Sequence, residues 1–156
     1  MKLKIKVKIF RDHTLPKIIS KGDWIDLSYK DATVHLNEGG FCYLPLGIAV
    51  QLPAGFEALV VARSSTYKNY GVFNPGAVGI IDNSYCGNDD EWMFPAYALK
   101  ETVIKSGSRL CQFRIQLSQK ATFWQKMKWF FSSGIELVEV DNLKGKNRGG
   151  LGSTGR

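Results

Sequence analysis

Asp82 ends an apolar run in the stretch VGIIDNSYCG, residues 78–87. A carboxylate at the end of a buried strand is partly desolvated, which suits a general base acting on a bound water. The same position is also typical of an acid that caps a turn. Tyr85 follows three positions later, just before the turn residues Cys-Gly-Asn. The stretch is therefore interpreted either as a base with an aromatic neighbour or as a structural turn.

Three further points carry polar side chains in chemically useful combinations. The segment 62–71, ARSSTYKNYG, joins Arg63 to two serines, which together can bind an anion. Gln112 lies inside an otherwise apolar segment, and a buried amide must find a hydrogen-bond partner. Asp26 lies between two apolar residues, as in a strand. The structural alternatives are a polar turn that starts a helix, a bonded core amide and a solvated edge acid.

The C-terminal stretch KGKNRGGLGSTGR, residues 144–156, has two alternatives of its own. Its glycine content and polarity are typical of a disordered tail. It also has the groups of a mobile phosphate clamp, because glycines let backbone N–H groups approach an anion and Arg148 supplies a charged fork. Taken alone, the stretch favours the tail.

Length and composition indicate one globular domain. The chain has 156 residues, 44% of them hydrophobic, and a formal net charge of +7. The positive charge favours anionic partners, either nucleic acid or phosphorylated small molecules. No apolar run has the length that a membrane span needs, and the alternating N-terminus does not resemble a signal peptide. We therefore expect a cytoplasmic protein with no membrane contact.

Short apolar segments bounded by turn residues predict an all-β sandwich or barrel. In the first of them, residues 2–10, Lys2, Lys4, Lys6 and Lys8 alternate with apolar residues, which predicts a strand with one wet face whose lysines discourage pairing at a sheet edge. The alternative is a basic stripe that contacts nucleic acid. The other predicted strands are 41–52, 56–62, 76–81, 91–99, 109–117 and 135–140.

The segment 122–134, TFWQKMKWFFSSG, departs from the strand pattern. Its aromatic residues and Met127 recur at helical spacing. Thr122 and Gln125 fit a capping box, and Gly134 fits a helix stop. We expect an inserted helix that packs over the end of a sheet. The alternative is a docking surface for another protein or a membrane face.

The order of five segments carries more weight than any one of them. GDWIDLS, RSSTYKNYG, GIIDNSYCGN, GSRLCQF and RGGLGSTG occur in the order and spacing of the five motifs of trimeric deoxyuridine triphosphate nucleotidohydrolases (dUTPases). The resemblance runs from the first strand to the C-terminus. The motif segments are most similar to the versions in Gram-positive bacteria and their prophages.

The resemblance implies a jelly-roll-like β subunit, with a short inserted helix here, that assembles as a homotrimer with three active sites at its interfaces. Residues 1–146 would form the single β domain, and residues 147–156 would form a flexible arm that closes a site. The implied reaction is hydrolysis of dUTP to dUMP and pyrophosphate, which keeps uracil out of DNA.

The resemblance also implies roles for individual residues. Asp82 would activate a water that attacks the α-phosphorus, and Tyr85 would pack under the deoxyribose. The backbone around residues 76–81 would read the uracil edge. A Mg²⁺ ion would be held by the phosphates and would reach Asp26 only through a water. The implied substrate-binding residues are Arg63, Ser64, Ser65, Gly76, Gly79, Ile80, Ile81, Tyr85, Gln112, Arg148, Gly152, Ser153 and Thr154.

The sequence departs from the family pattern at three places. Leu151 stands where the fifth motif commonly has an aromatic residue that stacks on uracil, so Trp92 or another aromatic is the alternative cap. Gly76 stands where the hairpin commonly has asparagine, with Asn74 nearby. The insertion at 122–134 is long for its position and is a candidate contact for a regulatory protein.

Two other functions stay open at this point. A deoxycytidine triphosphate deaminase has a similar fold and assembly, but it needs a general acid/base that directs water to the pyrimidine ring. A basic β module that binds single-stranded nucleic acid fits the net charge and the four tryptophans. That module would leave Asp82 and Gln112 without a role.

Overall fold

The computed structural model describes residues 1–150 and residue 155. In this part of the chain, twelve strands and two short helices form the all-β architecture that the sequence predicts. The strands are β1 (Leu3–Ile9), β2 (Ile25–Tyr29), β3 (Val34–Leu36), β4 (Phe41–Pro45), β5 (Ile48–Gln51), β6 (Phe56–Ala62), β7 (Val72–Phe73), β8 (Val78–Ile81), β9 (Met93–Ala98), β10 (Thr102–Ile104), β11 (Ser108–Leu117) and β12 (Ile135–Glu139). The helices are α1 (Thr66–Tyr70) and α2 (Phe123–Phe130).

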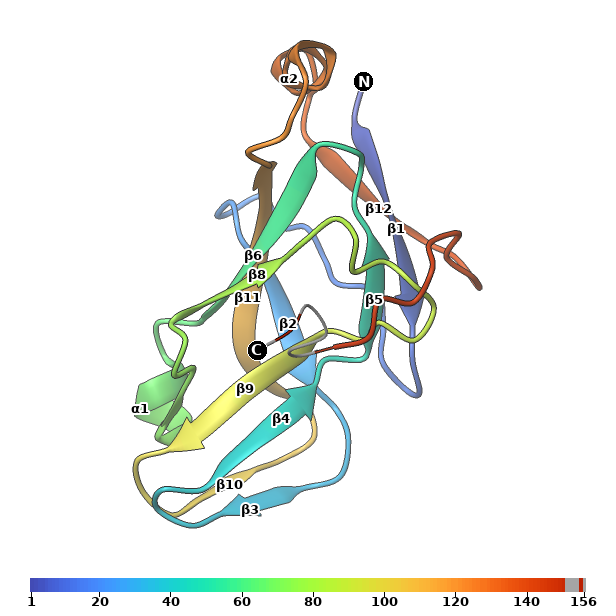
Figure 1. Ribbon diagram of the computed structural model, residues 1–156. Coiled ribbons are helices and arrows are strands. Elements are labelled where there is room, and N and C mark those ends of the chain that lie inside the picture. Colours follow the sequence, from blue (N-terminus) through green and yellow to red (C-terminus); the bar gives the residue numbers. More distant parts are fainter. Residues whose placement is uncertain (151–154, 156) are drawn as a thin grey trace.

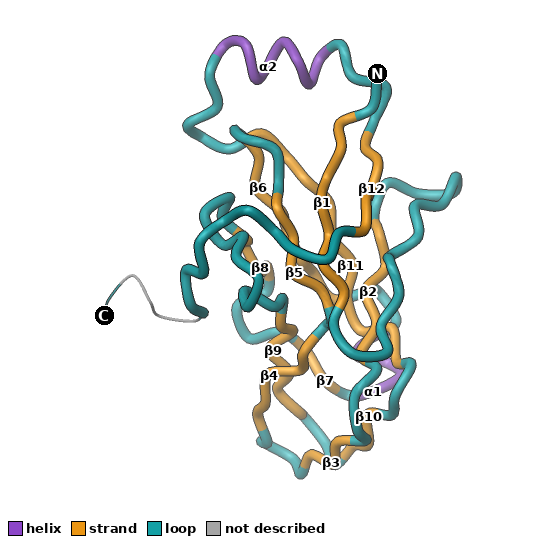
Figure 2. The backbone as a smooth tube through the Cα atoms, turned by 90° about the vertical axis from the view of Figure 1, so that its right-hand side faces the viewer, coloured by secondary structure: helices purple, strands orange, loops and turns teal. Residues whose placement is uncertain are grey.

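The strands form four small sheets around one core, in the jelly-roll-like arrangement that the family resemblance implies (Figure 1). Their orders are β12-β1-β5, β2-β11-β6-β8, β4-β9-β7 and β10-β3. In both ribbon views α2 lies at one end of the molecule and the β3–β10 pair at the other (Figure 2). The sheet that contains β6 and β11 matters most for function, because segments from four of the five motifs lie on it or next to it.

The core is filled from alternate positions of these strands. In β6, Phe56 and Val60 are buried, and in β11 Cys111 and Phe113 are buried. Side chains of a strand point to opposite faces in turn, so Gln112 faces away from the core. The alternation therefore places this amide on the outer face of the sheet, where it is half-buried.

The prediction that the lysine-rich first strand lies at a sheet edge is wrong. β1 is the middle strand of its sheet, parallel to β12 and antiparallel to β5. Leu3, Ile5 and Val7 are buried, so the prediction of one wet face is correct. The period-two pattern determines which face meets water, but the partners along the strand's edges come from distant parts of the chain.

The inserted helix is present, and its start is confirmed. The Thr122 hydroxyl accepts a hydrogen bond from the Gln125 N–H, and the Gln125 side chain accepts one from the Thr122 N–H at 2.8 Å, which completes the capping box. The helix ends at Phe130, four residues before the predicted stop at Gly134. Trp129 packs edge-on against the core residue Phe56, with ring centroids 5.3 Å apart.

The helix α2 does not bury most of its aromatic side chains, as a packing helix would. Four large aromatic side chains are exposed instead of buried, with Trp124 at 78% of its surface. The four are Phe123, Trp124, Phe130 and Phe131. No helix in the described residues is long and apolar enough to cross a membrane.

Candidate active site

Asp82 lies directly after the edge strand β8, as the sequence predicts. One of its carboxylate oxygens accepts hydrogen bonds from both the backbone N–H and the hydroxyl of Ser84, each at 2.8 Å. These two bonds are the main reason that the pKa of Asp82 lies below its ordinary value, with smaller contributions from the charges of Arg148 and Lys120. Asp82 is therefore an exposed, ionised carboxylate whose orientation is fixed by its own turn.

A pocket of about 430 Å³ opens beside Asp82. Glu57 and Lys120 line it, together with Gln125 from the first turn of α2. Gln125 packs so closely over Gly55 that any side chain at residue 55 would overlap it. The inserted helix is therefore a wall of the cavity that contains the candidate base.

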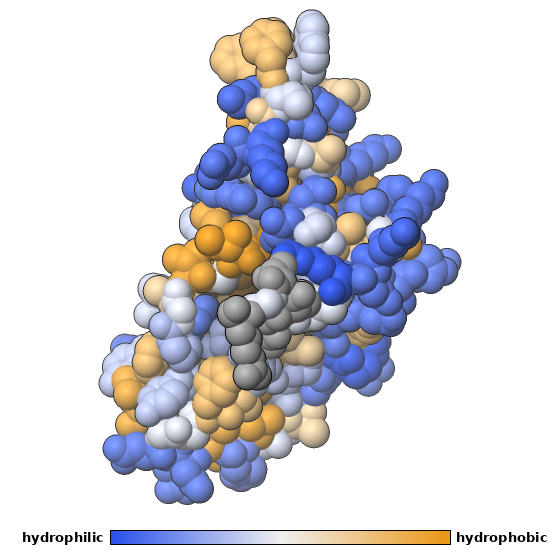
Figure 3. Space-filling view, in the orientation of Figure 1, coloured by the Kyte–Doolittle hydropathy of each residue, from blue (hydrophilic) through white to orange (hydrophobic). Residues whose placement is uncertain are grey.

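The hairpin that precedes Asp82 has an exposed edge. β8 pairs with β6, placing Gly79 opposite Val60, and no other described strand joins β8. Asn74 is buried and its side chain accepts the Gly76 N–H at 2.9 Å, which shapes the turn before β8. Ile80 is 65% exposed, and apolar atoms gather over β8 on this face (Figure 3). The free backbone edge and the apolar surface form a surface suited to a flat base.

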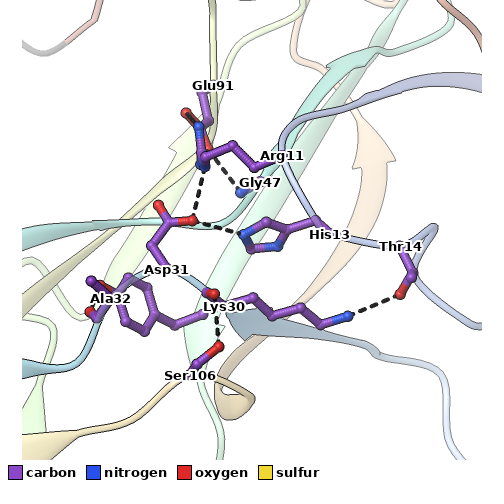
Figure 4. A network of polar contacts seen from close by, with 10 residues as sticks. Arg11, His13, Thr14, Lys30, Asp31, Ala32, Gly47, Glu91 and Ser106 are labelled. Carbon is purple, nitrogen blue, oxygen red and sulfur yellow. Dashed lines mark hydrogen bonds and ion pairs between the residues drawn. The ribbon is translucent and has the colours of Figure 1, made fainter.

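Tyr85 is held at its hydroxyl by Glu91. The phenol donates to the Glu91 carbonyl at 2.8 Å, while the ring packs against the core. The Glu91 carboxylate in turn pairs with Arg11 and accepts the Gly47 N–H at 2.9 Å (Figure 4). Burial is the main cause that raises the pKa of Tyr85, so the phenol stays neutral at ordinary pH.

The same network contains His13, one of the two histidines of the chain. His13 is only 8% exposed and lies across Gly47, where any side chain would collide with its ring. Asp31 bridges its ring nitrogen at 3.4 Å and the Arg11 guanidinium at 2.8 Å (Figure 4). Burial lowers the pKa of His13, so it is neutral at physiological pH.

The residues predicted to bind phosphate gather at the other end of β6. Arg63 pairs with Asp26 at 2.9 Å, and Arg109 reaches the same carboxylate at 3.4 Å. Gln112 lies directly opposite Asp26 in the β2–β11 register. Ser64 and Ser65 follow Arg63 at the start of α1, so the alternative of a polar turn that opens a helix is also realised.

Within one chain, this group is far from Asp82. Ile81, the residue before Asp82, pairs with Ala58 of β6. Arg63 lies five residues beyond Ala58, just past the end of β6. At the rise of an extended strand, this separation is roughly 17 Å. A single chain therefore presents two half-sites, a base half-site around Asp82 and a phosphate half-site around Arg63 and Gln112.

The first residues of the predicted C-terminal arm contact the turn that follows Tyr85. The backbone N–H groups of Arg148 and Gly149 donate to the Asp90 carboxylate, and Asn147 bonds to Asp89. The remaining predicted arm residues, Gly152, Ser153 and Thr154, lie outside the described residues, as does Leu151.

The suggestion that Trp92 caps the uracil is wrong. Its side chain is 0% exposed and packs edge-on against Phe113, with ring centroids 5.2 Å apart. A ring enclosed on all sides by the core cannot stack on a ligand. The burial of Trp92 could not be predicted, because this residue directly follows the acidic stretch at 88–91. Sequence alone does not show which side of a turn faces the core.

A magnesium ion fits this chain only in a substrate-held form. The described residues contain no group of three or more acids, histidines or cysteines that could hold a metal ion by themselves. The Asp26 carboxylate is already paired with two arginines. An ion carried by the triphosphate, with a water between it and Asp26, is compatible with that pairing because Mg²⁺ often keeps its waters.

Several residues outside the predicted set also organise the site. They are Ser84, Asp90, Glu91, Arg109 and Lys120. A signal was present for two of them, since the run Asn-Asp-Asp-Glu at 88–91 follows the Tyr85 turn and acids so concentrated invite backbone N–H partners. Arg109 and Lys120 are common surface residue types whose role depends on neighbours distant in sequence, whereas Ser84 acts on Asp82 only two positions away.

Comparison with known proteins gives a consistent result. A family model described as dUTPase matches residues 25–127. The SPbeta prophage-derived deoxyuridine 5'-triphosphate nucleotidohydrolase YosS of Bacillus subtilis (strain 168) is 46% identical over 156 residues, covering 98% of this chain and 99% of that protein.

Two solved structures share the fold. A dUTPase from Streptococcus mutans superposes with a TM-score of 0.66 at 20% identity, over 75% of this chain and 98% of that one. A mutant dUTPase from phage phi11 of S. aureus superposes with a TM-score of 0.65 at 15% identity, over 76% and 94%. The family match and the full-length 46% identical relative show that this chain belongs to the dUTPase family.

Proposed function

We propose that this protein hydrolyses dUTP to dUMP and pyrophosphate and so keeps uracil out of DNA. A water held by Asp82 attacks the α-phosphorus, the bond from that phosphorus to the bridging oxygen breaks, and pyrophosphate leaves. The observation that carries the proposal is the exposed Asp82 carboxylate, fixed by Ser84 beside a pocket, in a chain of the dUTPase family.

Asp82 acts mainly by orienting the water. Its lowered pKa guarantees the ionised form at neutral pH but also makes it a weak base. One oxygen is taken by Ser84, which leaves the other to accept a hydrogen bond from the water. Proton transfer to this oxygen then accompanies bond formation at phosphorus, when the attacking water becomes strongly acidic.

Recognition of the nucleoside is assigned to the hairpin and to Tyr85. The open edge of β8, with Gly76, Gly79, Ile80 and Ile81, offers backbone groups to the uracil edge. Tyr85 lies under the sugar, where a ribose hydroxyl would collide with the ring. The bond from its phenol to Glu91 supports this role, because it prevents the ring from moving aside.

Phosphate binding is assigned to Arg63, Ser64, Ser65 and Gln112, with Arg148, Gly152, Ser153 and Thr154 from the arm. Arg63 is paired with Asp26, so it is already oriented toward one place on the outer face of the sheet. Charge-assisted hydrogen bonds from such groups to phosphate oxygens are among the strong polar contacts in proteins. The arm would close over the β- and γ-phosphates.

Mg²⁺ is the proposed cofactor, held by the triphosphate and reached by Asp26 through a water. The phage phi11 dUTPase coordinates a structural Mg(II) ion, which makes a metal role in the family reasonable. When bound, the ion would neutralise negative charge on the leaving pyrophosphate. The pairing of Asp26 with Arg63 and Arg109 supports an indirect contact over a direct one.

A homotrimer is the proposed assembly. The base half-site and the phosphate half-site lie at opposite ends of β6 in one chain, so a complete site needs residues from more than one copy. The exposed aromatic face of α2 is retained as a proposed contact for a regulatory protein, because four large aromatic side chains are left in water there.

The decisive experiment is pyrophosphate release from dUTP beside dCTP, dTTP and UTP, with and without Mg²⁺. We expect release from dUTP alone and a strong stimulation by the metal. An ammonia assay on dCTP runs in parallel. Ammonia without pyrophosphate would replace the hydrolase by a deaminase, and oligonucleotide binding without any turnover would favour the nucleic-acid module.

A further inference from the structure

The segment that leads into the C-terminal arm is packed closely against the turn that follows Tyr85. Gly87 and Gly145 form a parallel bridge, and the Leu143 N–H donates to the Asn88 side chain at 2.7 Å. A side chain at Gly145 would overlap the Cys86 sulfur, so the two backbones approach as closely as glycine allows. The arm therefore leaves the domain from a defined place.

One buried carboxylate connects the two segments. Asp90 is 1% exposed. One of its oxygens accepts the N–H groups of Gly87 at 2.8 Å and Arg148 at 2.9 Å, and the other accepts Gly149 at 3.1 Å and Arg148 at 3.2 Å. A buried acid needs such partners, and here they come from both the turn and the arm.

The bonds to Asp90 link the arm to the surroundings of Asp82 through Arg148. Arg148 is bound at its backbone to Asp90, while its charge contributes to the lowered pKa of Asp82. The bonds to Asp90 therefore fix the backbone from which the Arg148 side chain extends.

We propose that Asp90 is a positioning residue that fixes the C-terminal arm at Arg148 and Gly149 and so directs Arg148 toward the triphosphate. This inference rests on the proposed dUTP hydrolysis. It concerns an acid that belongs to none of the five motif segments. The competing explanation is that Asp90 only closes its own turn at residues 87–90 and supports Tyr85.

The nucleotide itself distinguishes these explanations. An arm that grips the β- and γ-phosphates contributes to binding of dUTP but not of dUMP. A turn that merely supports Tyr85 contributes to both, because both contain the deoxyribose. Asp90→Asn keeps the shape of the side chain but leaves only one oxygen to accept the hydrogen bonds that two oxygens accept in the parent protein.

For Asp90→Asn we expect kcat/KM for dUTP to fall roughly tenfold to hundredfold, because the arm's phosphate contacts are misplaced. The inhibition constant of dUMP should stay within about twofold of the parent value. The matched control is Asp141→Asn, the same chemical change at an exposed acid of the neighbouring segment, which should leave both values unchanged. An equal loss of dUTP and dUMP binding, or no loss for dUTP, would overturn the proposal.

A double-mutant cycle with Arg148→Ala adds a second readout. If Asp90 acts through the arm, the double variant should lose less than the sum of the two single losses, whereas independent roles would give additive losses. Additive losses contradict the proposal.

A third measurement does not depend on any variant folding. In the unaltered protein, the amide protons of Arg148 and Gly149 should exchange with solvent slowly because both are bonded to a buried carboxylate. Exchange as fast as that of an unstructured peptide overturns the proposal. Pyrophosphate release by the parent enzyme is measured separately, so a failure here leaves the proposed function intact.

Discussion

The base half-site and the phosphate half-site hold their charges in different ways. Asp82 is fixed by uncharged donors of the neighbouring Ser84, and among the described residues no ion pair cancels its charge. In the phosphate half-site, Asp26 pairs with both Arg63 and Arg109. In the proposed mechanism, the Asp82 carboxylate can orient a water directly. Arg63 must instead exchange its carboxylate partner for a phosphate when substrate binds.

This difference has a physical reason. An uncompensated cluster of arginines would repel itself, so an acid between them stabilises the empty protein and sets their direction. The neutral donors of Ser84 orient the Asp82 carboxylate through one oxygen and leave the other to accept a hydrogen bond from water. Under the proposed function, the distance between the half-sites requires that they meet at a contact between chains.

The largest effect is expected from Asp82→Asn. Loss of the ionised oxygen should reduce turnover of dUTP by about 10²–10⁴-fold, the usual contribution of a positioned base. Pyrophosphate release measures turnover, and calorimetry with dUTP should show nearly unchanged binding. A variant that keeps its rate would remove Asp82 from the mechanism.

Removal of Arg63 should act on binding instead of on chemistry. For Arg63→Ala we expect KM for dUTP to rise roughly tenfold to hundredfold, since a charge-assisted hydrogen bond contributes about 1.5–3 kcal/mol. Arg114→Ala is the matched control, because Arg114 also lies on this sheet but pairs with Asp23 at 3.2 Å. Equal effects of the two variants would show that only general positive charge matters.

Mixing the two impaired variants, assayed at dUTP concentrations well below the KM of Arg63→Ala, tests whether the half-sites meet between chains. When Asp82→Asn and Arg63→Ala subunits are unfolded together and refolded, random assembly should restore about a quarter of the sites, because a quarter pair an intact base half-site with an intact phosphate half-site. The same variants refolded separately and then combined are the control. No recovery in the mixed sample would place the whole site within one chain.

The smallest expected effect is a shift in pH dependence. Because the pKa of Asp82 is lowered in the folded protein, its carboxylate is ionised throughout the neutral range and activity falls only as the pH drops through that lowered pKa. Ser84→Ala removes the hydroxyl donor, so the pKa should rise and the acidic limb of kcat/KM should move to higher pH. An unmoved limb would show that the hydroxyl bond does not control this carboxylate.

Much of the fold could be predicted from local patterns. β6, β11 and β12 match predicted segments, and the capping box of α2 begins at the predicted residue. The predictions failed where long-range partners decide the outcome. β1 was placed at an edge, and the aromatic residues of α2 were expected to pack, because neither strand neighbours nor the face toward the body can be read from periodicity.

The candidate site divides in the same way. The sequence indicated Asp82, Arg63 and Gln112, because a polar group in an apolar run is a local signal. It gave no indication that Trp92 is enclosed by the core or that Asp90 holds the arm. Both depend on segments that meet only after folding.

The sequence by itself determined the alternation that builds the strands, the start of the inserted helix and the identity of the residues able to do the chemistry. Only the tertiary structure decided which of them lie together, because contacts between residues distant in sequence follow from packing of the whole core. The separation of Asp82 from Arg63 along one strand and the closure of the arm onto Asp90 are both of this kind.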